Sequence, residues 1–287
     1  MQESKRKNNN KLIDAEARPL ISVIMGIYNC ESTLEDAVTS ILSQTVNNYE
    51  IIMCDDGSDD GTYDKACELM KANPDIIYVI RNRENKGLAC ALNRCLKIAK
   101  GKYIARMDGD DKCLPNRFET ELRELVEHSE LSVVSTDMMQ FDEDGIWGRA
   151  SCPIFPRKRD FVYETPFFHA PCMMRASDLK KIGGYNEDKK VYRVEDYDLW
   201  VRFYANGFQG KNINKPLYLM RDDRNAFHRR KLKYRMNEAY VISNAVKQFD
   251  LPLFYYLFCV KPILLGLMPP FVYAAVHKWR RKNGQEN

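Results

Sequence analysis

The chain has 287 residues, which is long enough to bury a large core in one or two domains. Its formal net charge is only +4 and no basic stripe is interleaved with aromatic residues, so no nucleic-acid partner is indicated. The nine cysteines are scattered without a Cys-x-x-Cys pair, which argues against a disulfide framework or a zinc site and fits the reducing cytosol.

The N-terminal residues 1–18 are polar and lack the apolar stretch of a signal peptide, so we expect them to be disordered. The first predicted strand follows at residues 20–28 and leads into Asn29. A second buried strand, residues 49–54, ends in the acidic turn 55–62. In an open parallel sheet, ligands bind at the carboxyl ends of the strands, so these turns are expected to share one site.

The remaining segments alternate between two periodicities. Apolar residues three and four apart predict helices, and short apolar runs predict strands. The predicted helices are residues 34–42, 62–70, 88–99 and 115–126, and the further strands are residues 76–80, 102–107 and 131–135. Such alternation predicts an α/β fold with a mostly parallel sheet flanked by helices.

The strand at 102–107 ends in three carboxylates, Asp108, Asp110 and Asp111. Asp108 and Asp110 are two residues apart, so on an extended backbone they point to the same side. Two hard oxygen ligands suit Mg²⁺ or Mn²⁺, which keep open positions for substrate phosphates. Crowded carboxylates also repel one another, so a positive group is expected among them. The alternative is an acidic surface turn that binds nothing.

A further helix is predicted at residues 195–204, where the apolar residues have helical spacing. Glu195 and Asp196 stand at its N-terminal end, where the helix dipole favours anions and lowers the pKa of a carboxyl group. These acids either cap the helix or provide a general base at the mouth of the site.

The C-terminal segment differs from the rest in its charge pattern. From residue 251 to 276 the only charged side chain is Lys261, while basic residues are dense at 229–235 and 278–282. Lys261 and the prolines divide the apolar stretch into pieces shorter than the roughly 20 residues that span a bilayer. Frequent aromatic residues are typical of a membrane interface, so we expect peripheral attachment to a membrane surface. The alternative is a pair of helices packed on the preceding domain.

Six short motifs together resemble the family-2 glycosyltransferases with the GT-A fold, over about residues 19–235. The motifs are Ser22-Val-Ile-Met-Gly-Ile-Tyr-Asn29, Asp55-Asp56-Gly57-Ser58, Asn85-Lys86-Gly87, Asp108-Gly-Asp110-Asp111, Gly183-Gly184-Tyr185 and Glu195-Asp196. The resemblance implies inverting transfer of a sugar from a nucleotide diphosphate sugar, with a divalent metal as cofactor.

The resemblance assigns nucleotide-binding roles to four positions. Tyr28 resembles a residue that stacks on uracil, and Asp56 one that accepts the N–H of the base, which favours a UDP-sugar donor. Lys86 resembles a basic loop residue facing the nucleotide, and Asp108 a residue near the ribose or the metal. Asp110 resembles the ligand that holds Mn²⁺ or Mg²⁺ at the diphosphate, where the ion acts as a Lewis acid.

The resemblance also assigns the chemistry on the acceptor. Asp196 matches the family's catalytic base, with Glu195 beside it and the aromatic Trp200 one turn later. His228 is the candidate for a histidine that completes the metal site, although its context matches the family poorly. His169 is expected to shape the acceptor pocket or to pack beneath it.

We therefore divide the chain into a glycosyltransferase domain at 19–235 and a C-terminal helical segment at 236–287. In the domain, residues 19–135 form the nucleotide-binding half and residues 136–235 the acceptor half. The Gln-x-x-Arg-Trp motif of processive family members is missing from the sequence, which favours a single sugar addition. By analogy with the family, the acceptor is a glycan or a lipid-linked molecule in polysaccharide biosynthesis, used at the inner face of the cell membrane.

Two other classes of protein share some of these sequence features. A sugar-phosphate nucleotidyltransferase needs a glycine-rich phosphate loop with a basic residue after the first strand, and here that place holds Tyr28-Asn29-Cys30-Glu31. A non-catalytic metal-binding or membrane scaffold is the second alternative. The run from Asp56 to Gly61 begins like an EF-hand loop, but Cys67 stands where a bidentate glutamate is required.

Overall fold

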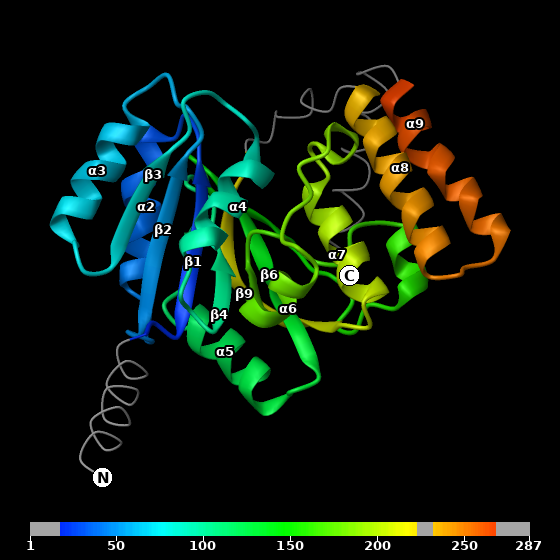
Figure 1. Ribbon diagram of the computed structural model, residues 1–287, viewed down its shortest axis with the longest axis horizontal. Coiled ribbons are helices and arrows are strands. Elements are labelled where there is room, and N and C mark those ends of the chain that lie inside the picture. The colour runs from blue at the N-terminus through cyan, green and yellow to red at the C-terminus, as the bar shows by residue number, and fades with distance from the viewer. Residues whose placement is uncertain (1–17, 223–231, 268–287) are drawn as a thin grey trace, which may run out of the picture.

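A computed structural model describes residues 18–222 and 232–267 of the chain. The predicted disordered N-terminus, except its last residue, lies outside the described residues, as do His228 and the end of the C-terminal segment. Figure 1 shows a sheet with helices on both of its faces and a group of helices at one end, formed by the C-terminal part of the chain.

The first half of the chain follows the predicted alternation of strand and helix. Its strands are β1 (Ile21–Ile27), β2 (Tyr49–Asp55), β3 (Ile77–Arg81), β4 (Tyr103–Arg106) and the short β5 (Lys112–Cys113). Its helices are α2 (Glu31–Leu42), α3 (Thr62–Ala72), α4 (Leu88–Ile98) and α5 (Arg117–Glu127). Strand β1 is parallel to both β2 and β4, and β2 is parallel to β3, so the ends of β1, β2 and β4 lie together.

The second half contains the predicted strand at 131–135 and the predicted helix at 195–204, together with elements that the sequence pattern did not indicate. Its strands are β6 (Leu131–Asp142), β7 (Gly145–Ala150), β8 (Cys172–Arg175) and β9 (Gln209–Arg221). The helical segments are η1 (Lys158–Val162), α6 (Ala176–Lys181), η2 (Lys189–Val191), α7 (Glu195–Ala205), α8 (Leu232–Gln248), η4 (Leu253–Cys259) and α9 (Val260–Leu267).

The α/β class is confirmed, but the sheet is mixed rather than mostly parallel. Within the described residues the strand order is β3-β2-β1-β4-β8-β6-β9-β5, with β7 paired to β6. Strand β8 is antiparallel to β4 and to β6, and β6 also forms a hairpin with β7. The sequence predicted only the first part of β6, because the strand continues beyond its buried run into partly exposed residues near the β7 turn.

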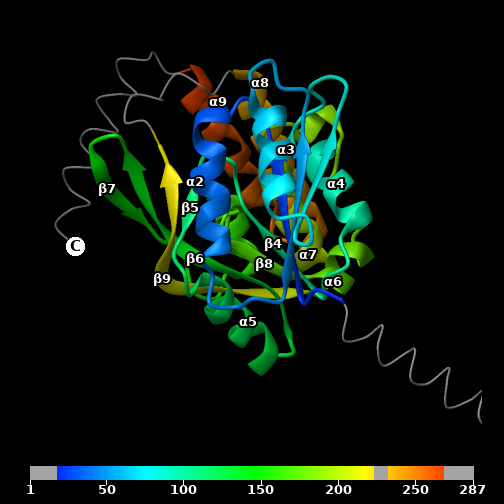
Figure 2. The ribbon, with the colours of Figure 1, turned by 90° about the vertical axis from the view of Figure 1, so that its left-hand side faces the viewer.

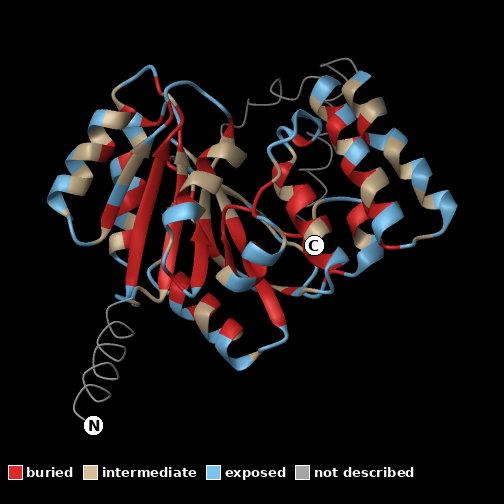
Figure 3. Ribbon diagram, in the orientation of Figure 1, coloured by how far each residue is buried: buried red, intermediate tan, exposed pale blue. Residues whose placement is uncertain are grey.

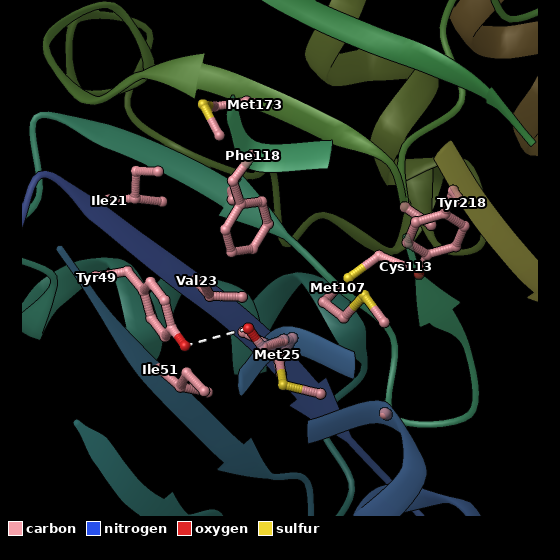
Figure 4. Close-up of a cluster of buried hydrophobic side chains, with 14 of the residues drawn as sticks. Ile21, Val23, Met25, Tyr49, Ile51, Met107, Cys113, Phe118, Met173 and Tyr218 are labelled. Atoms are coloured by element: carbon pink, nitrogen blue, oxygen red, sulfur yellow. Dashed lines mark hydrogen bonds between the residues drawn. The ribbon is translucent and has the colours of Figure 1, made fainter. Parts of the chain in front are cut away.

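The two faces of the sheet bury two separate cores. Along β1, Val23 and Met25 point to the face covered by α2, α3 and α5, whereas Ile24 points to the face covered by α4, α7 and α8. Figure 2 shows α2 and α3 on their face, and Figure 3 shows that the central strands are buried throughout. In the first core, where Figure 4 shows Tyr49 among apolar side chains, the Tyr49 hydroxyl donates a hydrogen bond to the Ile41 carbonyl at 3.1 Å.

The C-terminal helices pack on the second core. Buried residues of α8, including Val241, Ile242 and Val246, join those of α7, and Tyr255 and Phe258 of η4 pack against the same cluster. Helix α8 begins before residue 236, where we expected the C-terminal segment to begin. No helix among the described residues is long and apolar enough to cross a bilayer.

Arg117 is completely buried in the first turn of α5 and joins that helix to two strands of the sheet. Its Nε donates to Glu121 Oε1 at 3.2 Å, and its Nη2 donates to the carbonyl oxygens of Arg106 at 2.9 Å and Cys172 at 3.4 Å. Burial raises the pKa of Glu121 to about 7, while the positive charge of Arg117 acts in the opposite direction. The guanidinium therefore ties the end of β4 to β8 and to α5.

Replacing Arg117 is expected to destabilise the fold strongly. Arg117→Met leaves Glu121 buried without its cation, so the free energy of unfolding should fall by about 3–5 kcal/mol. Arg123→Met, at an exposed position of the same helix, should change it by less than about 0.5 kcal/mol. Urea denaturation followed by circular dichroism measures both variants. Equal stability of the two variants would show that Arg117 does not hold these elements together.

Candidate active site

The predicted site residues gather around a cavity of about 520 Å³ at the carboxyl ends of β1, β2 and β4. Its lining includes five of the residues singled out by the sequence, namely Tyr28, Asp56, Asp108, Asp110 and Glu195. The first four follow strands of the parallel half of the sheet, while Glu195 begins α7. The topology therefore brings together residues that are far apart in the chain.

Asp56 organises the loop that follows β3. Its carboxylate accepts hydrogen bonds from Asn82 Nδ2 at 2.6 Å, from the Lys86 backbone N–H at 3.0 Å and from the Gly87 backbone N–H at 2.7 Å. Gly87 has a φ of +93°, and a Cβ there would lie 2.7 Å from the Tyr192 ring. Glycine is therefore required at this position by both backbone conformation and packing.

Tyr28 lines the same cavity from the turn after β1. Its side chain is 44% exposed, so one face of the ring is available to a ligand. The turn is held to the loop after β2, because Asn29 N–H donates to Ser58 Oγ at 3.0 Å and Asp59 N–H donates to Asn29 Oδ1 at 3.0 Å. Tyr28 and Asp56 thus belong to two loops that are directly bonded to each other.

The three carboxylates after β4 form one cluster. One oxygen of each of Asp108, Asp110 and Asp111 lies within 4.8 Å of the others. Desolvation and the negative charge of Asp108 raise the pKa of Asp110. Burial, together with the charges of both neighbours, raises the pKa of Asp111 well above its usual range. The repulsion expected from the sequence is therefore present in the folded site.

A positive group does lie among the carboxylates, and it is Arg106, the last residue of β4. Its guanidinium forms an ion pair with Asp108 Oδ2 and is itself almost completely buried. Arg221, at the end of β9, also faces the cluster: its backbone N–H donates to Asp111 Oδ1 at 2.7 Å, and its Nε donates to the Asp110 carbonyl at 3.3 Å. Both arginines line the cavity.

The cluster fits a divalent cation such as Mn²⁺ or Mg²⁺. The donors are hard carboxylate oxygens close enough to share one ion. Burial and then mutual repulsion raise the pKa values of Asp110 and Asp111, and a cation relieves the repulsion. Asp108 and Asp110 line the cavity, whereas Asp111 is buried behind them and bonded to the Arg221 backbone. The arrangement agrees with Asp110 and Asp108 as the predicted ligands.

Helix α7 brings Glu195 to the cavity wall. The Glu195 side chain is buried, and its Oε2 has no hydrogen-bond partner among the described residues. Burial, followed by the charge of Asp196, raises the pKa of Glu195. Asp196 is half-buried, and its Oδ1 accepts the Tyr197 backbone N–H at 2.8 Å. It is not among the described residues that line the cavity.

Other predicted residues lie beside the cavity rather than in its wall. Lys86 contributes its backbone N–H to Asp56, but its side chain lines a neighbouring hollow with Arg94 and Lys97. His169 is buried, and its Nε2 is hydrogen-bonded to the Tyr185 hydroxyl at 2.8 Å. Burial and the charge of Arg106 hold the pKa of His169 well below its usual range, so the imidazole is neutral.

Several residues of the site had no signal of their own in the sequence. Arg221 and Tyr218 come from β9, and Tyr218 accepts the Asp108 backbone N–H at 3.2 Å. Tyr192 lies in the loop before α7 and covers Gly87. Arg106 lies two residues before Asp108, so the expected repulsion among carboxylates was the signal that could have identified it.

The sequence comparisons agree with this geometry. Residues 22–183, more than half of the chain, match the family described as Glycosyl transferase family 2. EpsE of Bacillus subtilis (strain 168), whose name assigns it to the glycosyltransferases, is 43% identical over 268 residues, covering 93% of this chain and 96% of its own. The Escherichia coli UDP-Glc:alpha-D-GlcNAc-diphosphoundecaprenol beta-1,3-glucosyltransferase WfaP is 31% identical, covering 68% of this chain and 74% of its own.

Solved structures show the same fold at low sequence identity. The S. aureus TarS 1-349 complex with UDP-GlcNAc has a TM-score of 0.65 and 18% identity, over 86% of this chain and 71% of that one. The mannosyltransferase PcManGT from Pyrobaculum calidifontis, in complex with GDP-Man and Mn²⁺, has a TM-score of 0.64 and 20% identity, over 90% and 74%. The nucleotidyltransferase and scaffold alternatives are not supported, and the chain belongs to glycosyltransferase family 2, with the GT-A fold.

Proposed function

We propose that this enzyme transfers one sugar, with inversion, from a UDP-sugar to a glycan or lipid-linked acceptor in polysaccharide biosynthesis, and that it uses Mn²⁺ or Mg²⁺. The observation that carries the proposal is the single cavity that collects Tyr28, Asp56, the Asp108–Asp110 pair and Glu195. The names of the relatives and the ligands of the structural neighbours support the same reaction class.

The nucleobase of the donor is assigned to the space between the loops after β1 and β2. Tyr28 offers an exposed aromatic face for stacking, and Asp56 offers carboxylate oxygens for a base N–H. Asp56 already accepts three hydrogen bonds, which fix its position before the donor arrives. Lys86 is held through its backbone, and its ammonium group is assigned to the edge of the nucleotide site.

The diphosphate of the donor is assigned to the acidic cluster. Asp110 and Asp108 would hold the divalent cation, which supplies Lewis-acid stabilisation of the departing nucleotide diphosphate when it is bound. Two residues outside the cavity lining hold the acidic turn in place. Asp111 accepts a hydrogen bond from the Arg221 N–H, and Arg117 donates one to the Arg106 carbonyl. His228, which lies outside the described residues, remains a proposed third ligand.

The first turn of α7 is assigned to the acceptor. An acceptor hydroxyl oxygen forms the new bond to the anomeric carbon as the bond to the diphosphate oxygen breaks, and Asp196 takes the hydroxyl proton. Glu195 is the neighbouring acid in the cavity wall, and its burial supports a role in orienting the acceptor. The neutral His169 beneath, bonded to Tyr185, is assigned to the floor of the acceptor half.

The C-terminal helices are assigned to a membrane surface at the inner face of the cell membrane. Five apolar side chains on η4 and α9 are exposed, and they are together called the C-terminal stripe: Leu253, Leu257, Val260, Leu264 and Leu267. Lys261 is the single charged residue between 251 and 276. Its Nζ donates a hydrogen bond to the Tyr163 carbonyl at 2.8 Å, so its charge is held against the preceding domain. Basic residues before and after this segment in the sequence complement an anionic lipid surface.

Asp110→Asn is expected to abolish metal-dependent donor binding without unfolding the protein, because it removes a charged oxygen ligand. A thermal-shift screen of UDP-sugars, GDP-mannose and nucleoside triphosphates, with and without Mn²⁺, measures this effect through ligand stabilisation. The control is Asp144→Asn, an exposed acid far from the cluster in sequence. Undiminished Mn²⁺-dependent stabilisation by UDP in Asp110→Asn would contradict the assignment. A response to nucleoside triphosphates alone would instead favour a nucleotidyltransferase.

Asp196→Asn is expected to lower kcat by roughly 10²–10⁴, the usual contribution of a general base, with little change in donor affinity. Glu195→Gln serves as the matched comparison, because the two acids are adjacent on α7 and only Glu195 lines the cavity. Single-turnover rates and UDP-sugar affinities separate chemistry from binding. If Glu195→Gln shows the larger loss in kcat and Asp196→Asn remains active, the base is Glu195.

The double variant Leu257→Ser, Leu264→Ser is expected to weaken binding to anionic vesicles by about tenfold or more, since each buried leucine contributes about 1.5–3 kcal/mol. Co-sedimentation of the full chain with phosphatidylglycerol vesicles measures this. Val126→Ser, which removes an exposed apolar residue on α5, is the control and should bind as the wild type does. Wild-type protein that ignores such vesicles, or a double variant that binds equally well, would sink the membrane assignment.

A further inference from the structure

Arg106 is a buried cation whose role goes beyond the ligand set of the acidic cluster. It ends β4, two residues before Asp108, and its side chain is only 4% exposed, yet it lines the cavity. Its carbonyl is held by Arg117 Nη2 at 2.9 Å, which fixes the strand end from which the guanidinium projects. A charge buried in this way is costly unless a partner compensates it.

The partner that Arg106 has is Asp108, which is also a proposed metal ligand. The ion pair occupies Oδ2 of that carboxylate. Tyr185, Tyr218 and the neutral His169 also lie near the guanidinium and supply no full negative charge, whereas Asp110 is a second carboxylate whose pKa the charge of Arg106 acts to lower. The positive charge of Arg106 is therefore balanced by Asp108, and to a lesser degree by Asp110, which are the two carboxylates proposed to hold the divalent cation.

The guanidinium also keeps an unused donor. Its Nε is buried and has no hydrogen-bond partner among the described residues. Leaving such a donor unpaired costs free energy, and a ligand oxygen that reaches it recovers that cost. Because Arg106 lies in the cavity wall beside the acidic cluster, an anionic oxygen entering the cavity is a suitable acceptor.

We propose that Arg106 is the resident counter-ion of the acidic cluster, which keeps the affinity for free metal low and makes the divalent cation and the nucleotide diphosphate bind together. A divalent cation that enters alone competes with the guanidinium for Asp108 and is repelled by it. A diphosphate that enters with the cation brings negative charge for both, and it offers an acceptor to the guanidinium. The proposal rests on the metal site proposed above and adds the residue that couples its two ligands.

The coupling can be measured without turnover. Electron paramagnetic resonance of Mn²⁺ gives the affinity of the full-length enzyme for the ion with and without UDP, and linkage requires that Mn²⁺ changes the UDP affinity by the same factor. We expect the wild type to bind Mn²⁺ weakly alone and much more tightly with UDP. In Arg106→Gln, affinity for Mn²⁺ alone should rise by roughly tenfold or more, because a nearby unit charge acts strongly in a cavity wall. The enhancement by UDP should shrink accordingly.

Two further variants separate charge from structure. Arg106→Lys keeps the positive charge and should retain most of the wild-type coupling. Lys112→Gln removes a cation six residues beyond the end of β4. Lys112 pairs with Asp36 at 2.7 Å and does not line the cavity, so the coupling in this variant should equal that of the wild type. Circular dichroism verifies that each variant is folded.

The outcomes distinguish this proposal from the site on which it rests. Mn²⁺ binding by the wild type that is tight and independent of UDP overturns the counter-ion role, whether or not Arg106→Gln folds, and leaves the metal site standing. Unchanged or weaker affinity of folded Arg106→Gln for Mn²⁺ alone also overturns it. No Mn²⁺ binding by the wild type even with UDP rejects the metal site itself, and the counter-ion role with it.

Discussion

Mutual repulsion among three carboxylates at one strand end is the constraint around which the site is built. Asp111 is buried, so its charge must be met by hydrogen bonds, and the Arg221 N–H provides one. Asp108 forms an ion pair with Arg106, and Arg117 donates a hydrogen bond to the Arg106 carbonyl at the end of the strand. The carboxylates can be crowded here because the Arg106 guanidinium at the end of β4 and the Arg221 N–H at the end of β9 compensate them, while α5 holds the end of β4.

The parallel half of the sheet explains why the sequence could predict that the residues proposed to bind the nucleotide lie close together. Each of Tyr28, Asp56 and Asp108 follows a strand whose apolar run is unambiguous, and parallel strands that are neighbours place their carboxyl ends at one edge. The turn residues are local, so short motifs are enough to indicate them. The mixed pairing of β8 and β6 had no comparable signal, because antiparallel strands need no crossover helix between them.

The rest of the site depends on contacts between distant parts of the chain. Arg221 reaches Asp110 across 111 residues, and Tyr218 reaches Asp108 across 110, through a strand whose polar and charged residues hide its periodicity. Lys86 was expected to face the nucleotide; its backbone N–H binds Asp56 in the cavity wall, while the residue also lines the hollow beside the cavity. Residue type and spacing indicated these chemistries, whereas the direction of each side chain required the folded structure.

Helix α8 connects the exposed C-terminal face to the cavity. Asn237 Nδ2 donates to the carbonyl oxygens of Lys189 at 3.1 Å and Tyr192 at 2.9 Å, and so holds the loop that precedes α7. Tyr192 in that loop lines the cavity and packs against Gly87, which Asp56 holds from the other side. Because α9 and η4 pack on α8, the surface assigned to the membrane and the wall of the donor cavity are joined by one helix and two hydrogen bonds. Such a connection fixes the orientation of the acceptor side of the cavity relative to any surface on which the C-terminal stripe rests.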